Sequence, residues 1–238
     1  DVIERIGHQN PDLVKPALGP KEPWAYRNKM QMPVGGTKGD IQMGFYAMGS
    51  HDIVQGTNCP IQDEGNNIIA KACYQLAKEF DIEPYDEHTG KGVLRHIIGR
   101  IGQSGWMIIL VTATEQLPHK EKWVENLTER IPQVETIVHN VNGKRTNVIL
   151  GPKNNILYGD GTITDHIKDL QFTLSPHSFF QVNPEQTTVL YDQALEYANL
   201  KGDETVIDAY CGTGTISLFL AHKAKHVIGI EIVEPAII

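Results

Sequence analysis

The chain has 238 residues, of which 40% are hydrophobic and 21% charged, and its formal net charge at pH 7 is −8. This length and composition are those of a globular protein with enough chain to bury a sizeable core, and two domains are expected rather than one. The acidic net charge counts against a nucleic-acid partner unless basic residues gather on one face.

The residue pattern also argues against membrane insertion and disulfide cross-linking. No apolar run approaches the about 20 residues that a membrane helix needs, and the first residues do not form a signal peptide. The 3 cysteines include no C-x-x-C pair. We therefore expect a cytoplasmic, monomeric protein without a membrane partner.

The first elements in chain order are a helix end, a linker and a hairpin. Residues 1–10 are typical of the last turns of a helix, and residues 16–23 form a linker rich in Pro and Gly. Period-two alternation predicts a strand over 24–32, paired with 41–48 across the turn-rich residues 35–40. The hairpin is locally basic, and a solvated strand face is favoured over an RNA-binding face.

Helices and short strands alternate after this hairpin. Residues 66–80 form an amphipathic helix, in which Cys73 is expected to be a small buried hydrophobe, and 119–130 form a charged surface helix. Strands are expected at 93–101, 106–113, 134–141, 146–150, 156–158, 161–164 and 170–174. Asn142-Gly143 predicts a type I′ hairpin between the third and fourth of these. Residues Lys91, Arg95, His96 and Arg100 form a second basic patch.

Residues 1–174 are therefore expected to be a central α+β antiparallel domain. Ser175-Pro176 marks the hinge to a second unit, at residues 175–238. There a helix is expected to begin after Asn183, which acts as N-cap with Pro184 and Gln186 behind it. Gly202 is expected to end this helix. Strands at 205–207 and 227–230 flank a glycine turn and a helix, and another helix is expected at Glu234-Pro235.

The glycine turn between these strands predicts a ligand site. Gly212 and Gly214 allow the backbone to turn sharply and to approach a ligand closely. Asp208 precedes them, and Glu231 ends the next strand, where it can accept both hydroxyls of a ribose. Ser217 replaces the third glycine of a dinucleotide fingerprint, and a carboxylate at 208 repels a pyrophosphate, so S-adenosylmethionine (SAM) is favoured over NAD. Cys211 lies inside the turn, and a packing role is favoured over a nucleophilic one.

Two motifs together support a family resemblance. Phe180-Gln181-Val182-Asn183-Pro184 precedes the D-x-x-C-G-x-G pattern of residues 208–214. With these motifs the chain resembles the RNA uracil-5-methyltransferase family, RumA/TrmA type, and among its members those that modify 23S ribosomal RNA. The likeness extends over essentially the whole chain, from Tyr26-Arg27-Asn28-Lys29 onward. It implies that the second unit is the start of an α/β Rossmann-like class I SAM-dependent methyltransferase domain.

The resemblance also implies roles for single residues. SAM contacts are expected from Gln181, Tyr210, Thr215 and Glu231, in addition to Asp208, Gly212 and Gly214. Cys59 matches the last of four cysteines that hold a [4Fe–4S] cluster in many members, and this sequence lacks the other three.

The family's chemistry depends on residues that these 238 positions do not contain. A cysteine thiolate in a Ser-Cys-Asn-Pro motif adds to uracil C6, and a glutamate removes the C5 proton. Neither this motif nor the preceding Asp-Pro-Pro motif occurs in the sequence. We therefore expect an internal portion of a longer enzyme, with no catalytic residue of its own and not competent alone. The alternatives are a non-catalytic RNA-binding or assembly module with a vestigial SAM fold and, ranked last, an NAD-dependent oxidoreductase.

Overall fold

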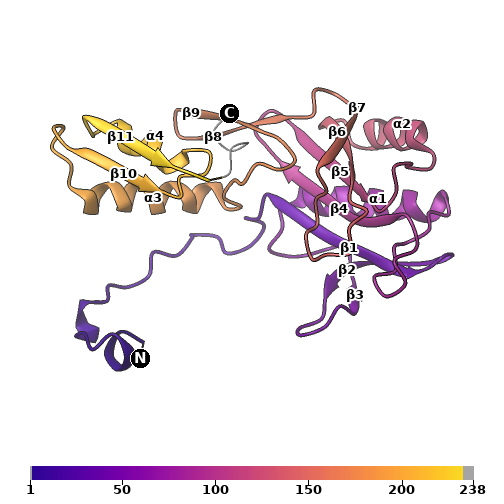
Figure 1. The fold of residues 1–238 in the computed structure, drawn as a ribbon, viewed down its shortest axis with the longest axis horizontal. Helices are drawn as coiled ribbons and strands as arrows, with labels where there is room; N and C mark the ends of the chain where they lie inside the picture. Colours follow the sequence, from indigo (N-terminus) through magenta and orange to yellow (C-terminus); the bar gives the residue numbers. More distant parts are fainter. Residues whose placement is uncertain (1, 233–238) are drawn as a thin grey trace.

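The computed structural model describes residues 2–232. Figure 1 shows a sheet with two helices at one end, a smaller strand–helix–strand unit at the other, and an N-terminal segment that runs away from the sheet. This arrangement agrees with the prediction of an α+β unit followed by the start of a Rossmann-like unit. None of the helices within residues 2–232 is both long and apolar enough to cross a membrane.

The large unit is built on a seven-stranded sheet with the order β3-β2-β1-β4-β5-β6-β7. The strands are β1 (Lys29–Thr37), β2 (Asp40–Tyr46), β3 (Ile53–Gln55), β4 (Leu94–Ile101), β5 (Trp106–Thr112), β6 (Val134–Val141) and β7 (Lys153–Tyr158). The expectation of an antiparallel sheet was wrong at one place, because β5 and β6 pair in parallel. Helix α2 (Lys120–Arg130) lies between them in the chain, and such a crossover brings the next strand back in the same direction.

Both faces of this sheet are covered. Along β5, Ile108 and Leu110 belong to a core with α1 (Glu64–Glu79) and α2, whereas Met107 and Ile109 belong to a second core on the other face. A strand buried on both faces is apolar throughout, and all but the first residue of β5 are buried. The predicted buried role of Cys73 is confirmed in the first core, where burial raises the pKa of its thiol.

The second core joins the sheet to the rest of the chain. It contains residues of the hairpin β8 (Ile163–Ile167) and β9 (Leu170–Leu174), together with Phe180, Tyr191 of α3 (Pro184–Ala198) and Phe219 of α4 (Thr215–Ala221). Strands β10 (Thr205–Ala209) and β11 (His226–Ile230) pair in parallel and form a separate sheet. Two aromatic pairs, Phe172 with Phe180 and Tyr191 with Phe219, pack within this core.

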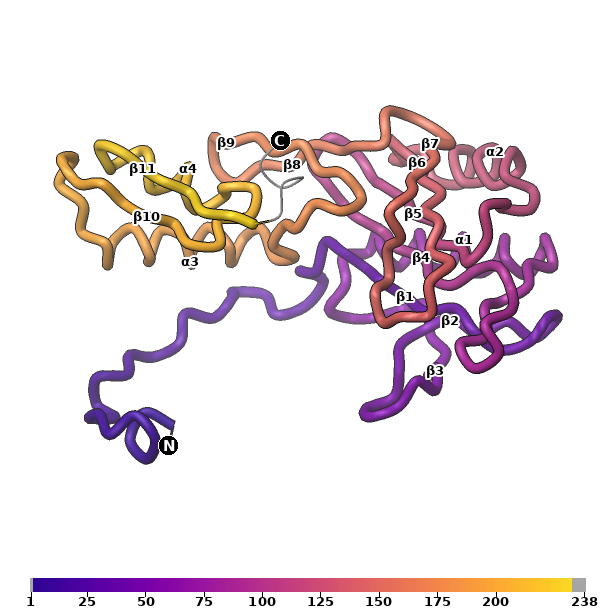
Figure 2. The backbone as a smooth tube through the Cα atoms, viewed as in Figure 1, coloured from indigo at the N-terminus to yellow at the C-terminus, as the bar shows by residue number. Residues whose placement is uncertain are grey.

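The N-terminal segment lies outside these cores. Instead of the end of a regular helix, Val2–Ile6 form an exposed π-helical turn, and the predicted linker has no regular structure. Figure 2 shows this segment running beside α3 before it enters β1. It contacts α3 where the Gln186 side chain donates to the carbonyl of Leu18 and where Lys15 lies 5.2 Å from the Tyr197 ring centre.

Three local predictions were wrong for identifiable reasons. The first strand begins at Lys29, because Ala25 is left-handed and Arg27 donates its N–H to the carbonyl of Ile61 instead of a strand partner. Residues 146–150 form no strand, because the Asn142 amide donates to the carbonyls of Val148 and Ile149 and folds this segment back as a loop. Helix α3 ends at left-handed Asn199 rather than at Gly202. The helix expected at Glu234-Pro235 lies outside the described residues.

The predicted second basic patch is largely interior. Arg95, His96 and Arg100 are 3%, 6% and 4% exposed, and only Lys91 of the four is exposed. In the first hairpin Lys38 is exposed, as a solvated face requires, but Lys29 is half-buried. Burial, with Arg100 and Arg27 nearby, lowers the pKa of Lys29 to about 8.

Candidate functional site: the turn between β10 and α4

The turn after β10 is tight because three of its residues adopt left-handed backbone angles. These are Tyr210, Gly212 and Gly214, with φ of 64°, 57° and 76°. Glycine adopts such angles without a Cβ penalty, so the two glycines fit the turn that the sequence predicts. Gly214 directly precedes α4, and its N–H donates to the carbonyl of Cys211 at 2.9 Å.

The parallel pairing of β10 with β11 brings both predicted carboxylates to one edge. Asp208 pairs with Gly229 and Ala209 with Ile230, so Glu231 follows β11 at the carboxyl end of the sheet. Its Oε2 accepts the N–H of Gly212 at 2.9 Å, and its Oε1 accepts the N–H of Ile232. The carboxylate of Glu231 is therefore fixed against the glycine turn.

Ser217 holds the other carboxylate. Its hydroxyl donates to Asp208 Oδ2 at 2.5 Å, from the first turn of α4. The sequence showed Ser217 only as a departure from the dinucleotide fingerprint, although a serine at that position of the helix lies within reach of the strand end. Asp208, Gly212, Gly214 and Glu231 are thus brought together.

Cys211 packs between the turn and β11. Its N–H donates to the carbonyl of Ile230 at 3.1 Å, and a Cβ added at Gly229 would lie only 2.8 Å from its Sγ. Glycine at 229 therefore provides the space that the thiol occupies, which favours the packing role for this cysteine.

Tyr210 and Thr215 have different surroundings. Tyr210 is 89% exposed, so its ring is free to cover a ligand but contacts little of the protein. The hydroxyl of Thr215 lies 2.9 Å from that of Tyr191, whose ring packs edge-on against Phe219 with centres 5.1 Å apart. Tyr191 was not singled out from the sequence, because an aromatic residue on an amphipathic helix looks like ordinary core.

Gln181 lies on the segment that joins β9 to α3. It lines a hollow of about 480 Å³ with Leu18 and residues of α3, and none of residues 208–215 lines this hollow. The segment itself is anchored to the sheet, because Asn28 donates its N–H to the carbonyl of Val182 at 2.9 Å and the guanidinium of Arg100 donates to the carbonyl of Ser178. Burial lowers the pKa of Arg100 to about 10.

The surroundings of Cys59 show whether it can be a cluster ligand. Its backbone N–H and carbonyl bond the side chain of Asn67, and its thiol is free. Within residues 2–232 no group of three or more His, Cys, Asp or Glu side chains could hold a metal ion. Residues 2–232 alone therefore do not fit an iron–sulfur cluster.

Comparison with curated proteins finds close relatives along the whole chain. It is 53% identical over 239 residues to an uncharacterized RNA methyltransferase of Halalkalibacterium halodurans and 50% identical over 239 residues to one of Bacillus cereus. Each match covers 100% of this chain and 52% of the relative. The chain thus spans about half the length of the curated relatives it matches, and no family model matches it.

Among solved structures, the chain is similar to the Pyrococcus abyssi tRNA (uracil-54, C5)-methyltransferase in complex with S-adenosyl-L-homocysteine. The TM-score is 0.73 at 24% sequence identity, over 91% of this chain and 51% of that one. This likeness confirms the predicted fold, an α+β unit followed by a Rossmann-like α/β unit.

Proposed function

We propose that the protein to which this chain belongs is a SAM-dependent RNA methyltransferase that forms 5-methyluridine in 23S ribosomal RNA. The observation that carries the proposal is the pair of carboxylates, Asp208 and Glu231, fixed on either side of a left-handed glycine turn at the carboxyl ends of two parallel strands. Ligands of open α/β sheets bind at this edge. The relatives named as RNA methyltransferases support RNA as substrate class.

The site suits a ligand with a cationic end and a ribose. Asp208 offers a carboxylate to an ammonium group, and the same carboxylate would repel a pyrophosphate. Glu231 offers acceptors to ribose hydroxyls, and its bond to the Gly212 N–H keeps those acceptors in place. In this proposal Tyr210 covers the bound ligand, Thr215 adds a polar contact, and SAM when bound supplies the methyl group as an electrophile. Gln181 would approach the ligand from the segment before α3, since it lines the hollow there and not the turn itself.

The chemistry at uracil needs groups outside these residues. Uracil C5 becomes nucleophilic after a thiolate adds to C6 and then takes the methyl group. A base next removes the C5 proton, and the thiolate leaves C6 as the C5–C6 double bond re-forms. In our proposal a cysteine and a glutamate elsewhere in the longer protein carry these steps, and this chain contributes ligand binding and orientation. No step is assigned to a [4Fe–4S] cluster, since Cys59 alone does not hold one.

Calorimetric titration of the intact protein tests the ligand. We expect SAM and S-adenosylhomocysteine to bind and NAD to give no heat. NAD binding without SAM binding would contradict the proposal and would favour an oxidoreductase. SAM binding without methyl transfer to any RNA would instead favour a binding or assembly module.

A further inference from the structure

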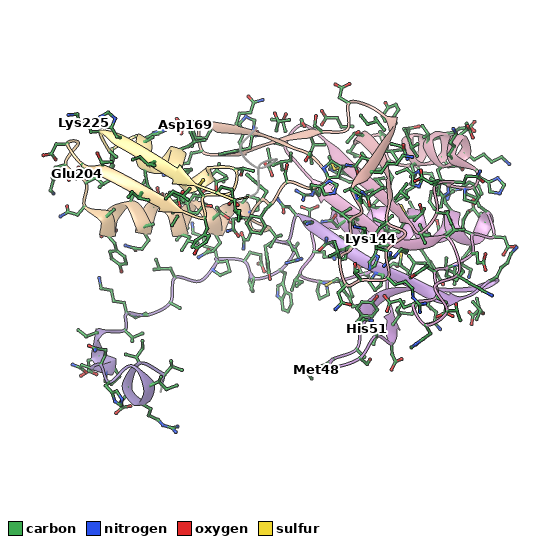
Figure 3. The ribbon with its side chains drawn as sticks, viewed as in Figure 1. Met48, His51, Lys144, Asp169, Glu204 and Lys225 are labelled. Carbon is green, nitrogen blue, oxygen red and sulfur yellow. The ribbon has the colours of Figure 1, made fainter. Side chains whose placement is uncertain are left out.

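Five chain segments, one of them the β2–β3 hairpin, enclose two hollows of about 210 and 260 Å³. The hollows share Tyr85, Glu87 and Arg95, so they adjoin each other. They are lined by residues 34–36 of β1, by the hairpin, by the loop at residues 85–88, by the start of β4 and by the loop at residues 145–147. Figure 3 places His51 and Lys144 of this region in the opposite half of the molecule from Glu204 and Lys225, which lie beside β10 and β11.

A β-bulge directs two buried basic side chains into these hollows. Successive strand residues normally point to opposite faces. The pairing of β4 with β5 nevertheless passes from Leu94 directly to His96, so Arg95 is an extra residue, and both Arg95 and His96 line the same hollow. Bulges of this kind re-aim side chains and are over-represented beside functional sites.

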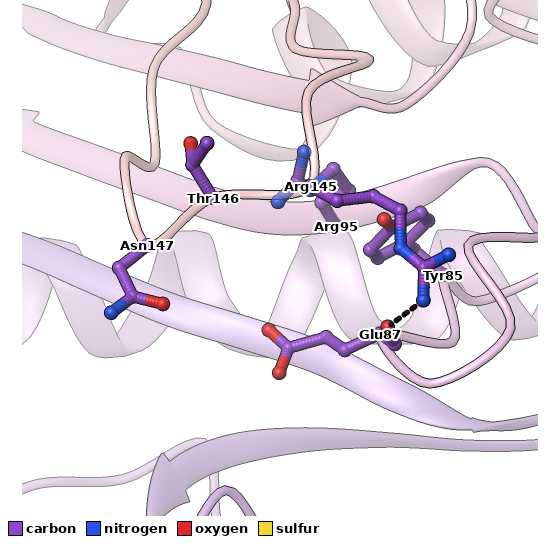
Figure 4. Close-up of a pocket in the computed structure, with 6 residues that line it drawn as sticks. All are labelled: Tyr85, Glu87, Arg95, Arg145, Thr146 and Asn147. Atoms are coloured by element: carbon purple, nitrogen blue, oxygen red, sulfur yellow. Dashed lines mark hydrogen bonds between the residues drawn. The ribbon is translucent and has the colours of Figure 1, made fainter.

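The two arginines of this region are held by carbonyl groups rather than by carboxylates. Arg95 donates to the carbonyls of Asn142 and Lys144 at 2.5 and 2.8 Å and stacks over the Tyr85 ring at 4.5 Å. Its Nε is buried and has no hydrogen-bond partner among the described residues. Arg145 donates to the main-chain carbonyl of Glu87 at 3.2 Å, as Figure 4 shows, and to that of His88 at 2.6 Å. Within residues 2–232 neither guanidinium bonds a carboxylate, although Asp52, Asp86 and Glu87 also line these hollows, and a phosphate is the anion that can bond both directly.

The Glu87 carboxylate is fixed but still open to solvent. It accepts the Tyr46 hydroxyl at 3.0 Å and lies 2.5 Å from Nδ1 of His51, and its side chain is 39% exposed. Figure 4 shows this carboxylate turned away from the guanidinium of Arg145. A carboxylate held in one orientation can accept paired N–H donors from the edge of a nucleobase.

Aromatic and neutral polar groups complete the surroundings. The rings of Tyr46 and His51 stack with centres 4.8 Å apart and an interplanar angle of 22°, and both side chains are exposed. Exposed aromatic faces are the surfaces on which unpaired bases stack. His96 is 6% exposed, and its Nδ1 has no partner among the described residues. Burial lowers its pKa to about 4, so the imidazole is neutral at pH 7 and can hydrogen-bond a base.

We propose that these hollows bind one unpaired guanosine nucleotide of single-stranded RNA. The inference rests on the proposed function, because that function makes RNA the partner. Guanine presents two adjacent N–H donors that match the Glu87 carboxylate, and its O6 and N7 are acceptors for arginine. The flanking phosphate would compensate Arg95 and Arg145. Adenine and uracil each lack the paired donors, so this geometry discriminates against them.

The test is fluorescence anisotropy with the intact protein and labelled oligouridines that carry one central guanosine or one central adenosine. Glu87→Gln removes the carboxylate, and Arg145→Ala removes the exposed guanidinium. Glu121→Gln and Arg130→Ala are the matched controls, since both side chains lie on α2 and do not line the hollows. SAM binding, measured by calorimetry, should be unchanged in all four variants and reports correct folding.

The wild-type protein should bind the guanosine oligomer about tenfold more tightly than the adenosine oligomer. Glu87→Gln should abolish this preference. Arg145→Ala should weaken binding to both oligomers and lower the slope of log affinity against log salt by about one. Both controls should behave as wild type.

Equal binding of the two oligomers by the wild type, or a preference retained by Glu87→Gln, would overturn the inference, as would an unaltered salt slope in Arg145→Ala. Methyl transfer measured on the same preparations separates the two proposals. Methyl transfer without guanosine preference contradicts only the nucleotide site. Guanosine preference without methyl transfer contradicts only the proposed function.

Discussion

Replacement of Gly229 by Ala should disturb the glycine turn through Cys211. The added Cβ would lie 2.8 Å from the Cys211 Sγ, whereas non-bonded carbon atoms prefer about 3.5–4.0 Å. The thiol must therefore move by roughly 1 Å, and with it the residue whose N–H bonds the carbonyl of Ile230. Overpacking costs about 1–3 kcal/mol, and the lower end applies here because Gly229 is exposed and the strand can shift. The displaced turn carries the Gly212 N–H away from Glu231, so we expect SAM affinity to fall about tenfold.

A double-mutant cycle tests this reasoning. Cys211→Ala removes the sulfur atom, so Gly229→Ala in that background should cost little, with a coupling of about 1 kcal/mol between the two sites. Urea unfolding gives the stability of each variant, and calorimetry gives its SAM affinity. Without a clash, Gly→Ala at a compatible strand position stabilises by about 0.4–1 kcal/mol. Additive effects, or a Gly229→Ala variant as stable as the wild type, would refute the packing of Cys211 against β11.

Three further changes have definite expected outcomes. Glu231→Gln keeps an acceptor for the Gly212 N–H but removes the charge, so calorimetry should show SAM affinity about tenfold lower; unchanged affinity would exclude a ligand contact there. Burial lowers the pKa of His96 to about 4 in the folded protein, whereas the imidazole of the unfolded chain is protonated below about pH 6.5. Between these pH values the proton binds the unfolded chain and not the folded one, so the free energy of unfolding falls as the pH falls below about 6.5. Urea unfolding should show that the free energy of unfolding is about 2 kcal/mol lower at pH 5 than at pH 7 in the wild type, and that this difference is absent in His96→Gln. The same difference in His96→Gln would show that His96 does not cause it. Arg100→Ala should lower the free energy of unfolding by about 1.5–3 kcal/mol, since the carbonyl of Ser178 loses a buried charged donor; a stability within about 0.5 kcal/mol of wild type would contradict that role.

Patterns within one element were predicted well from the sequence. The side chain of Asn183 caps α3 by accepting the N–H of Gln186 at 3.0 Å, as its position before Pro184 indicates. The glycine turn and the two carboxylates also lie where strand, turn and helix order place them. These features depend on residues close together in the chain, and their local chemistry is visible in the sequence.

Features that depend on contacts between separate segments of the chain were not predicted. Asn142-Gly143 has the composition of a tight hairpin, but the buried Asn142 side chain bonds a later loop instead. The acceptors of Arg95 and Arg100 are main-chain carbonyls. Because every residue has such a carbonyl, these acceptors cannot be recognised from the sequence, and the two arginines were grouped in a basic patch. The parallel pairing of β5 with β6 follows from how α2 packs on the sheet, which periodicity alone does not specify.

The central claim is methyl transfer to uridine C5 by the protein that contains this glycine turn. The most direct measurement incubates the intact protein with methyl-labelled SAM and, separately, with unmodified 23S ribosomal RNA and transfer RNA, and then maps labelled nucleosides. We predict labelled 5-methyluridine in the 23S ribosomal RNA. Labelled 5-methyluridine in transfer RNA alone would contradict 23S ribosomal RNA as the substrate. The absence of labelled 5-methyluridine from both RNAs would contradict uridine C5 methylation itself.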